Sequence, residues 1–553
     1  MPRALLAGET LGASLAELAR QSGRSSATFP ESREKISAAE LDVAATDAAA
    51  EFHRLGVSGE LVGVLVTTTP TFFVTIFGLW RAGAALSVLP APKELGSAER
   101  IARRLAAIVR AAGIRHVVAD QGHAELAERL AELVTGLQVL DAGQRPSGAH
   151  PGMLPVVGPD GLAVVQFTSG STSAPKGVML THRAVLAGLL ACVVSGEFSA
   201  DDIFMQWVPT FHDMGLIGLL SHWLNGAQVH VFTPSAFLRR PARVLRYFGE
   251  HRGTVITGPN FSYDHLLDAV GPDQLAGLDL SSWRLAFNGA EPVNPETVRR
   301  FGQRFAEAGV SPSVMYPVYG LAEATLAVSF PRPGSAVRIV DIQRASLEAD
   351  STAVRLAGRG DSGDALKRAV SVGYPVHGMA VRIAGETAGG DTALGEIQIR
   401  GDAVTIGYYG GGSADQKLFT GDGWLRTGDL GFRLDGELFV MGRRKEMIVV
   451  HGQNFFPEDV ESIVREVPGL YQKRCVAFPA SDGYMERMGV IAEVGGGTAT
   501  DDLRRQITRR IAGELSLSQV DVHLVEPKWL TRTTSGKWQR SLAAQRIAAR
   551  RDA

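Results

Sequence analysis

Apolar runs long enough for buried strands alternate with amphipathic segments in the first part of the chain. Residues 61–66 (LVGVLV) and 85–90 (ALSVLP) are apolar runs, and residues 69–84 between them have the length and pattern of a helix. Residues 100–113 predict a second helix, and residues 116–120 predict a third strand. Strands that alternate with helices are typical of a layered sheet with helices on its faces. The pattern therefore predicts an α/β fold built from βαβ units.

The same alternation continues further along the chain, where each predicted strand runs directly into a polar loop. Four such strand–loop segments have the sequences AVVQFTSGS, AQVHVFTPS, TVITGPN and RLAFNGAE. In open α/β sheets, ligands bind beyond the carboxyl ends of the strands. These loops are therefore the places where a binding site is expected.

The pattern changes in the last part of the chain. Residues 346–368 are polar and weakly periodic, which predicts an insertion or a mobile surface loop. The runs EIQIRG, LFVMGRR and EMIVVHG predict antiparallel strands with tight turns such as the Asp-Gly pair at 435–436. The remaining strands and helices predict a small α+β unit of about a hundred residues. We therefore expect two domains, residues 1–442 and residues 443–553.

Composition and charge are consistent with a globular protein of more than one domain. A chain of 553 residues exceeds what one hydrophobic core usually supports. The net charge of −2 gives no reason to expect a nucleic-acid or anionic-membrane partner. Cys192 and Cys475 are too isolated for a disulfide framework or a zinc site, and each is expected to be buried. Glu9 interrupts any signal-like segment, and no apolar window is long enough to span a membrane, so a cytoplasmic protein is expected.

Residues 167–186 (FTSGSTSAPKGVMLTHRAVL) contain a Gly-rich loop that ends in a lysine, followed by an apolar segment expected to be a helix. In a Walker loop the lysine follows a glycine and precedes Ser or Thr, whereas here Lys176 precedes Gly177 and Val178. Hydroxyl groups, flexible glycines and a positive charge still favour phosphate binding. From composition alone, a surface hairpin or a solvated loop is an equally good interpretation.

Three other segments carry candidate chemistry. Asp429 lies in a Thr-Gly-Asp turn, where a carboxylate can bind vicinal ribose hydroxyls, although a simple β-turn is the more common explanation. Lys537 lies in TRTTSGKWQR, a charge cluster that includes Arg532 and Arg540 and that alone predicts solvated surface. Residues 358–363 match GxGxxG but lack a preceding strand, so we give this match little weight.

The order of these segments resembles the motif series of the adenylate-forming superfamily, which includes acyl-CoA synthetases, adenylation domains of peptide synthetases and luciferases. The series is FTSGSTSAPKGVMLTH, NGAEP, YGLAEAT, RTGD, GRRKEMIVVHGQNFFPEDVE and TTSGK, and it covers essentially the whole chain. Within the superfamily the chain is most similar to fatty acyl-AMP ligases. The segments VPTFHDMGLIG (208–218) and YGLAEATLAVS (319–329), and the long segment before residues 371–375, carry that resemblance.

The resemblance implies a large N-terminal domain of layered βαβ sheets plus a distorted β-barrel, with a small mobile α+β C-terminal domain. It implies ATP and Mg²⁺ as cofactors, with Glu323 as the metal ligand, Tyr319 stacked on adenine and Asp429 bound to the ribose, helped by Arg443. In chain order, the implied nucleotide-binding positions are Thr168, Ser169, Gly170, Ser171, Thr172, Lys176, Gly289, Ala290, Glu291, Pro292, Tyr319, Gly320, Leu321, Ala322, Asp429 and Arg443.

The same resemblance implies an activity and a moving domain. A carboxylic acid, fatty or otherwise hydrophobic, reacts with ATP to give an acyl-adenylate and pyrophosphate. Lys537 bridges the carboxylate and the α-phosphate, His212 lies near the acyl carboxylate, Glu323 acts through the metal, and Lys445 is the hinge. The expected acyl tunnel is lined by Trp207, Thr210, Met214, Phe261 and Met315.

The acceptor of the acyl group is expected to be the phosphopantetheine thiol of a carrier protein. No carrier-like domain follows Lys537, so the carrier is expected to be a separate chain. The alternative is an acyl-CoA or aryl-CoA ligase that uses free CoA. A non-catalytic nucleotide-binding protein is disfavoured because Lys537, Glu323 and Asp429 are all present, and a P-loop ATPase or kinase is disfavoured because the loop lacks GK[ST].

Overall fold

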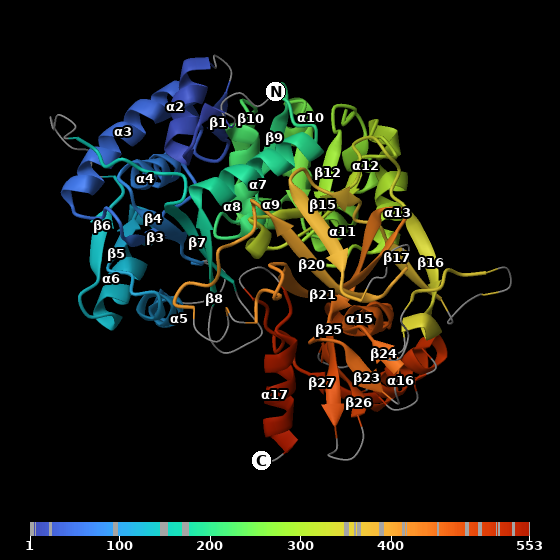
Figure 1. Cartoon of the computed structure of the whole chain (residues 1–553). Helices are drawn as coiled ribbons and strands as arrows, with labels where there is room; N and C mark the ends of the chain where they lie inside the picture. The colour runs from blue at the N-terminus through green and yellow to red at the C-terminus, as the bar shows by residue number, and fades with distance from the viewer. Residues whose placement is uncertain are drawn as a thin grey trace.

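The computed structural model describes most of the chain. The described residues are 5, 7–21, 25–91, 98–143, 153–168, 176–347, 353–358, 361, 366–385, 392–411, 415, 417–450, 453–481, 486–495, 500–515, 517, 520–533 and 537–551. A large α/β part fills the upper two thirds of Figure 1, and a smaller part that ends in helix α17 lies below it.

The first sheet has six strands in the order β6-β5-β3-β4-β7-β8, all parallel except for the last pair. Its strands are β3 (Leu61–Leu65), β4 (Ala85–Val88), β5 (His116–Ala119), β6 (Gln138–Asp141), β7 (Leu162–Thr168) and β8 (Lys176–Thr181). The crossover helices are α4 (Pro70–Arg81), α5 (Ala98–Ala111) and α6 (Ala124–Leu133). The predicted βαβ units at the start of the chain are confirmed.

The second sheet has seven strands in the order β13-β12-β11-β9-β10-β1-β2, and only its β1–β2 pair is antiparallel. Its strands are β1 (Ser26–Phe29), β2 (Glu34–Ser37), β9 (Ile203–Gln206), β10 (Gln228–Val231), β11 (Val255–Gly258), β12 (Leu285–Asn288) and β13 (Met315–Pro317). The other helices described in the large part are α2 (Leu11–Gln21), α3 (Ala38–Arg54), α7 (His182–Ser195), α8 (Asp213–Trp223), α9 (Pro234–Arg239), α10 (Pro241–Glu250), α11 (Asn260–Ala269), α12 (Pro272–Leu275) and α13 (Pro295–Phe305).

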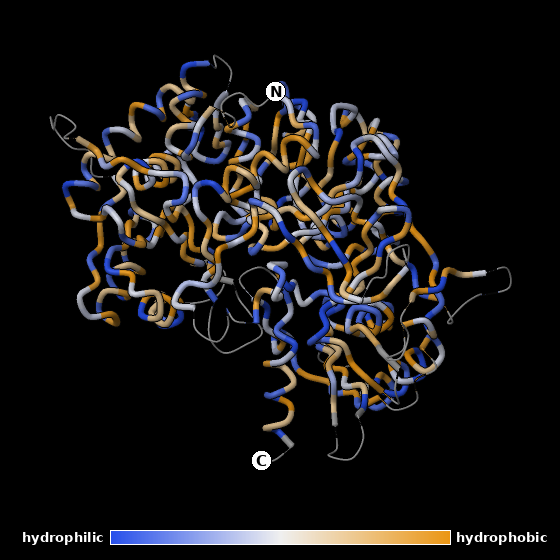
Figure 2. The backbone as a smooth tube through the Cα atoms, in the orientation of Figure 1, coloured by the Kyte–Doolittle hydropathy of each residue, from blue (hydrophilic) through white to orange (hydrophobic). Residues whose placement is uncertain are grey.

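The main core lies between these two sheets. Helices α7 and α8 are apolar on nearly every face and are almost fully buried, as expected for helices that pack between two layers. One hydrophobic cluster contains residues of both sheets together with Phe73 and Trp80 of α4. Figure 2 shows the same arrangement, with hydrophobic segments in the interior of the large part.

The strands expected to form the barrel make two small antiparallel sheets. These are β14 (Tyr319–Gly320), β15 (Ala327–Phe330) and β18 (Tyr374–Pro375), and then β19 (Met379–Ile383), β20 (Gly395–Gly401), β21 (Leu425–Leu434) and β22 (Glu437–Arg443). A bridge between Ser371 and Phe439 joins them. Asp435 and Gly436 both have positive φ, of 53° and 81°, which is the predicted tight hairpin turn.

The smaller part contains two further sheets and three helices. Its elements are β23 (Ile448–Val450), β24 (Gln453–Phe455), α15 (Pro457–Arg465), β25 (Leu470–Ser481), β26 (Glu486–Val494), α16 (Thr500–Leu515), β27 (Val520–Val525) and α17 (Arg540–Arg551). It has its own core around Val460, Cys475 and Ile507. Helix α17 was not predicted from the sequence, because its charged residues obscure the apolar face formed by Ala543 and Ile547.

Two predictions about individual segments need correction. The segment after the Gly-rich loop does not enter a helix directly: it forms β8, which pairs with β7 in the register Thr168–Lys176, and α7 begins only at His182. The described part of the 346–368 segment is more than a surface loop, since Val354 is buried beside the hairpin of β16 (Ile339–Gln343) and β17 (Leu366–Val370).

Two further expectations concern cysteines and membrane spans. Cys192 and Cys475 are both buried free thiols, as expected. Among the helices that the structure describes, none has both the length and the apolar character needed to cross a membrane.

Candidate active site

The Gly-rich loop connects two antiparallel strands at the carboxyl end of β7. Ser169, Gly170, Ser171 and Thr172 lie outside the described residues, and Thr168 is described by its backbone only. Lys176 begins β8, and its ammonium lies 4.8 Å from the centre of the Tyr408 ring. The candidate phosphate lysine is therefore held against an aromatic face.

Glu323, the predicted metal ligand, lies in the short helix η4 (Ala322–Ala324). The Tyr408 hydroxyl donates a hydrogen bond of 2.8 Å to Glu323 Oε1, and the Glu323 carbonyl accepts one of 2.8 Å from the Thr405 N–H. Thr325 then adopts a left-handed φ of 63°, which is costly for a β-branched residue. Its hydroxyl donates to the Ala403 carbonyl at 2.7 Å, so the turn that carries Glu323 is fixed on both sides.

Asp429, Tyr319 and Arg443 come together at the β21–β22 hairpin. The Tyr319 hydroxyl donates to Asp429 Oδ2 at 2.6 Å, and Arg443, which pairs with Asp429 in the strand register, lies 3.4 Å from Oδ1. Burial raises the pKa of Asp429, while the positive charge of Arg443 opposes that effect. A carboxylate in this position can accept hydrogen bonds from the two hydroxyls of a ribose.

The predicted adenine pocket follows β12. A Cβ at Gly289 would lie 2.7 Å from a methyl group of Val318, so only glycine permits this close approach. Ala290 has a φ of 65°, which turns the chain sharply toward Glu291 and Pro292. Glu291 Oε1 accepts the Phe261 N–H at 2.6 Å, and burial raises the pKa of that carboxyl group.

Gly320, Leu321 and Ala322 connect Tyr319 to Glu323. A Cβ at Gly320 would lie 1.8 Å from the Leu326 carbonyl oxygen, so the backbone there is compact. The Leu321 N–H donates to that same carbonyl at 2.9 Å. This tight turn connects Tyr319, the predicted adenine-stacking residue, to Glu323, the predicted metal ligand.

Lys537 of the small part lies among charged residues of the large part. It is solvent-exposed, yet the protein around it lowers the pKa of its ammonium, and Arg443 lowers it further. The carboxylates of Asp213 and Asp429 act in the opposite direction. Residues from distant segments of the chain therefore act together on the Lys537 ammonium.

His212 precedes α8 as its N-cap residue and is directly followed by Asp213. The Asp213 carboxylate accepts the Met214 N–H at 2.7 Å. Burial raises the pKa of Asp213, and the nearby Lys537 opposes that effect. The Asp213 carboxylate therefore follows His212 directly in the chain and interacts electrostatically with Lys537.

Arg540 was expected to be a solvated residue, and this expectation is wrong. Its guanidinium lies 2.7 Å from Glu446, 2.9 Å from Glu458 and 2.7 Å from Glu461. Glu461 is only 1% exposed, so the arginine neutralises a buried carboxylate. Because Arg540 begins α17, this cluster ties the segment of Lys537 to Glu446, near the predicted hinge.

Four of the five predicted acyl-binding residues gather in one hydrophobic cluster. Trp207, Met214 and Met315 are buried in the same hydrophobic core, and Phe261 packs against it. Thr210 is also buried, and its hydroxyl lies 3.3 Å from that of Thr68. The clustering is compatible with an apolar binding region, while the predicted tunnel itself stays a prediction.

The donor set around Glu323 is suited to Mg²⁺ rather than to a closed metal centre. No group of three or more His, Cys, Asp or Glu side chains forms a ready-made metal site among the described residues. Mg²⁺ commonly binds to one or two carboxylates and takes its other ligands from phosphate oxygens and water. Tyr408 bonds to Oε1 of Glu323, which leaves Oε2 as the oxygen suited to a cation.

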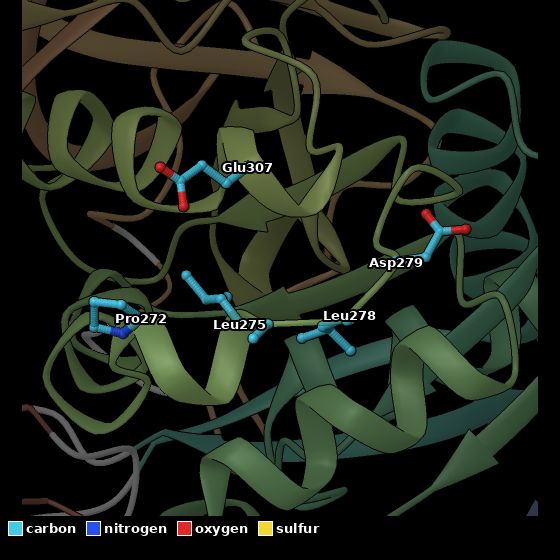
Figure 3. Close-up of a pocket in the computed structure, with 7 residues that line it drawn as sticks. Pro272, Leu275, Leu278, Asp279 and Glu307 are labelled. Carbon is cyan, nitrogen blue, oxygen red and sulfur yellow. The ribbon is translucent and has the colours of Figure 1, made fainter.

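A separate surface hollow of about 450 Å³ lies near α12, away from these residues. Figure 3 shows Pro272, Leu275 and Leu278 along its apolar floor, with Glu307 and Asp279 at its edges. None of the predicted site residues lines it. The hollow therefore does not belong to the candidate active site.

Comparisons with known proteins agree on one family. The family described as AMP-binding enzyme matches residues 15–409, and its C-terminal domain family matches residues 452–544. A medium-chain-fatty-acid–[acyl-carrier-protein] ligase of Moorena producens is 33% identical, over 94% of this chain and 92% of that protein. A 4-hydroxyphenylalkanoate adenylyltransferase of Mycobacterium tuberculosis is 33% identical, over 88% and 82%.

Solved structures give the same result. A structure from a study of fatty acyl-adenylate ligases of E. coli and L. pneumophila has a TM-score of 0.90 and 28% identity, and covers 98% of this chain and 99% of its own. A fatty acyl-adenylate ligase of L. pneumophila, in complex with acyl adenylate and pyrophosphate, has a TM-score of 0.74 and 27% identity over 98% and 97%. The predicted fold class, ligase activity and family resemblance are confirmed. The chain belongs to the AMP-binding enzyme family.

Proposed function

We propose that this chain activates a fatty or other hydrophobic carboxylic acid with ATP and passes the acyl group to the phosphopantetheine thiol of a carrier protein. The observation that carries the proposal is the position of Lys537. Its ammonium, on the small part, interacts electrostatically with Asp213 and Asp429 of the large part and with Arg443 at the junction of the two domains. This arrangement suits an enzyme that neutralises two anions, a carboxylate and a phosphate, as they approach each other.

In the proposed reaction a carboxylate oxygen attacks the α-phosphorus, and the bond to the bridging oxygen of pyrophosphate breaks. Lys537 reduces the repulsion between the carboxylate and the α-phosphate, and Lys176 holds the leaving pyrophosphate. Asp429 and Tyr319 orient the ribose. Glu323 would hold Mg²⁺, and the bound ion would neutralise phosphate charge.

The relatives' names support a carrier protein as the acceptor. One of them is an acyl-carrier-protein ligase of 33% identity, and a second ligase of that kind, from Teredinibacter turnerae, is 32% identical over 75% of this chain. Free CoA as the acceptor is the alternative. The names differ in the acid they specify, so the acid is not assigned.

We also propose a domain boundary at residues 442–443 and a hinge at Lys445. Arg443 pairs with Asp429 in the large part, whereas Glu446 is bound to Arg540 in the small part. The chain therefore changes partners between these two residues, which supports a hinge there.

Removal of the Lys537 ammonium tests the first half-reaction. Lys537→Ala is expected to reduce acid-dependent ATP–pyrophosphate exchange by at least about 100-fold, because removal of one preorganised electrostatic group commonly costs that much. Binding of a premade acyl-adenylate, measured by calorimetry, is expected to survive. Lys35→Ala, an exposed lysine on β2, is the control. Exchange near the wild-type rate in Lys537→Ala would contradict the proposed role.

The acceptor is tested with wild-type enzyme, ATP and a panel of acids, offered either a holo carrier protein or free CoA. Rapid thioester formation on the carrier alone is expected. Equal or faster formation of acyl-CoA would overturn the assignment of the acceptor but leave adenylate formation intact.

A further inference from the structure

Tyr408 is not one of the predicted site residues, yet it contacts both Lys176 and Glu323. It lies in the segment between β20 and β21 and is only 8% exposed. Its sequence context, Gly-Tyr-Tyr-Gly, gives no signal of chemistry beyond a turn. The structure brings it beside Lys176 and Glu323, which are 147 residues apart in the chain by their numbers.

The backbone around Tyr408 is fixed to the phosphate strand. A β-bridge joins Val178 of β8 to Tyr408, and the neighbouring Tyr409 N–H donates to the Gly177 carbonyl at 2.7 Å. The Tyr408 N–H itself donates to Asp415 Oδ1 at 2.8 Å. The ring is therefore held in place by the same strand that carries Lys176.

The hydroxyl of Tyr408 acts on the metal-binding side. It donates to Glu323 Oε1 at 2.8 Å. A carboxylate with one oxygen occupied by a donor has a restricted orientation, and its other oxygen is directed to a second partner.

The ring face of Tyr408 acts on the phosphate side. The Lys176 ammonium lies 4.8 Å from the ring centroid, within the range of a cation–π interaction. Such an interaction restrains the charged end of a long side chain without neutralising it. The Tyr408 ring therefore restrains the position of the Lys176 ammonium.

We propose that Tyr408 is a positioning residue that links the two halves of the ATP-phosphate site, its hydroxyl orienting Glu323 toward the metal and its ring holding the Lys176 ammonium. This inference rests on the proposed function. It adds a residue from a third segment of the chain, outside the Gly-rich loop and the η4 turn. The hydroxyl contact with Glu323 and the ring contact with Lys176 can be removed separately by substitution of Tyr408.

Tyr408→Phe keeps the ring and removes the hydroxyl, whereas Tyr408→Leu removes both contacts. In acid-dependent ATP–pyrophosphate exchange, Tyr408→Phe is expected to raise the half-saturating Mg²⁺ concentration by roughly tenfold and to change the KM for ATP little. Tyr408→Leu is expected to raise the KM for ATP as well, by a further factor of about two to five. Tyr409→Phe removes a hydroxyl one residue away and serves as the matched control.

A second readout does not depend on turnover. Mn²⁺ binding in the presence of a non-hydrolysable ATP analogue, followed by electron paramagnetic resonance, is expected to weaken in Tyr408→Phe and not in Tyr409→Phe. In a Glu323→Gln background, adding Tyr408→Phe is expected to have no further effect on Mn²⁺ affinity, because the two residues act through one contact.

The outcomes separate the inference from the function on which it rests. If wild-type enzyme shows no Mg²⁺-dependent exchange with any acid, the proposed function fails. If wild-type enzyme is active and Tyr408→Phe has wild-type Mg²⁺ and Mn²⁺ constants, the positioning role is overturned. A lower melting temperature with unchanged constants would identify a merely structural tyrosine and would also overturn it.

Discussion

At the scale of single residues, His222 of α8 shows how a buried polar group sets a pH limit on the fold. Its imidazole is stacked between Phe198 and Phe204, with ring centroids 3.9 and 4.0 Å away. Nδ1 donates to the Gly218 carbonyl at 2.9 Å, whereas Nε2 is buried with no partner among the described residues. Burial lowers the pKa of His222 to about 4, because a second N–H would be left without an acceptor.

We expect the folded protein to lose stability as the pH falls from about 6.5 to about 4. In that window the unfolded chain takes up a proton at His222 that the folded chain cannot hold, so the free energy of unfolding decreases. His222→Leu removes this titration, and its free energy of unfolding is expected to depend less on pH, by on the order of 2–3 kcal/mol across the window. Urea unfolding at a series of pH values measures the difference. Parallel curves for the two proteins would contradict the assignment.

At the scale of elements, helix α7 supports the turn that carries Glu323. A Cβ at Gly188 of α7 would lie 2.6 Å from the Thr325 side chain, which is fully buried and bound to the Ala403 carbonyl. Thr325 cannot move without breaking that hydrogen bond. Gly188→Ala is therefore expected to destabilise the protein by about 1–3 kcal/mol, the usual cost of overpacking.

The matched control is Gly302→Ala in α13, where a Cβ would meet nothing within 4 Å. Because alanine is the better helix former, this variant is expected to be more stable than wild type, by up to about 1 kcal/mol. Shifts of the urea midpoint in opposite directions for the two variants would support the packing argument. A stabilising Gly188→Ala would show that α7 and the Glu323 turn separate at little cost.

Hydrophobic periodicity predicts a helix or strand well where one face of that element is buried and the other is exposed. It fails where a short strand is followed directly by an apolar helix. Strand β8 was predicted as part of a helix because its six residues are followed by the apolar α7 with no intervening loop. The family was recognised because the order of the motifs is distinctive, whereas the roles of the individual motif residues stay predictions. Tyr408 and the ion pairs of Arg540 were missed, because a long-range contact of one tyrosine or one arginine leaves no pattern in the neighbouring sequence.

At the scale of the whole molecule, Lys537 of the small part interacts electrostatically with Asp213 and Asp429 of the large part, as the proposed first half-reaction requires. The small part is held together internally by Arg540, which joins α17 to Glu446 and to α15. On the large side, the Arg444 N–H donates to the Gly428 carbonyl at 3.0 Å. Lys445 lies between these two anchored residues, and it is exposed. A rotation there would move Lys537 out of the site together with the rest of the small part.

Contacts outside the hinge also hold the closed arrangement. Lys367 of β17 forms an ion pair of 2.9 Å with Asp459 of α15, and its ammonium lies 4.3 Å from the centre of the Phe456 ring. Phe456 packs in the same cluster as Val354. The proposed rotation about Lys445 would have to break these contacts. Freedom of the backbone at residue 445 would therefore be necessary for the rotation but would not be sufficient.

Fixing the backbone at residue 445 separates the two half-reactions. Proline restricts φ to about −65°, so Lys445→Pro is expected to keep ATP–pyrophosphate exchange within about threefold of wild type, because the closed arrangement needs no rotation. Single-turnover transfer from acyl-adenylate to a holo carrier protein is expected to fall by at least about tenfold if the proposed rotation about Lys445 precedes transfer. Lys445→Ala removes the same side chain but leaves the backbone free, and is expected to resemble wild type in both assays. Unimpaired transfer in Lys445→Pro would place the hinge elsewhere, whereas loss of exchange in that variant would show that residue 445 also shapes the closed state.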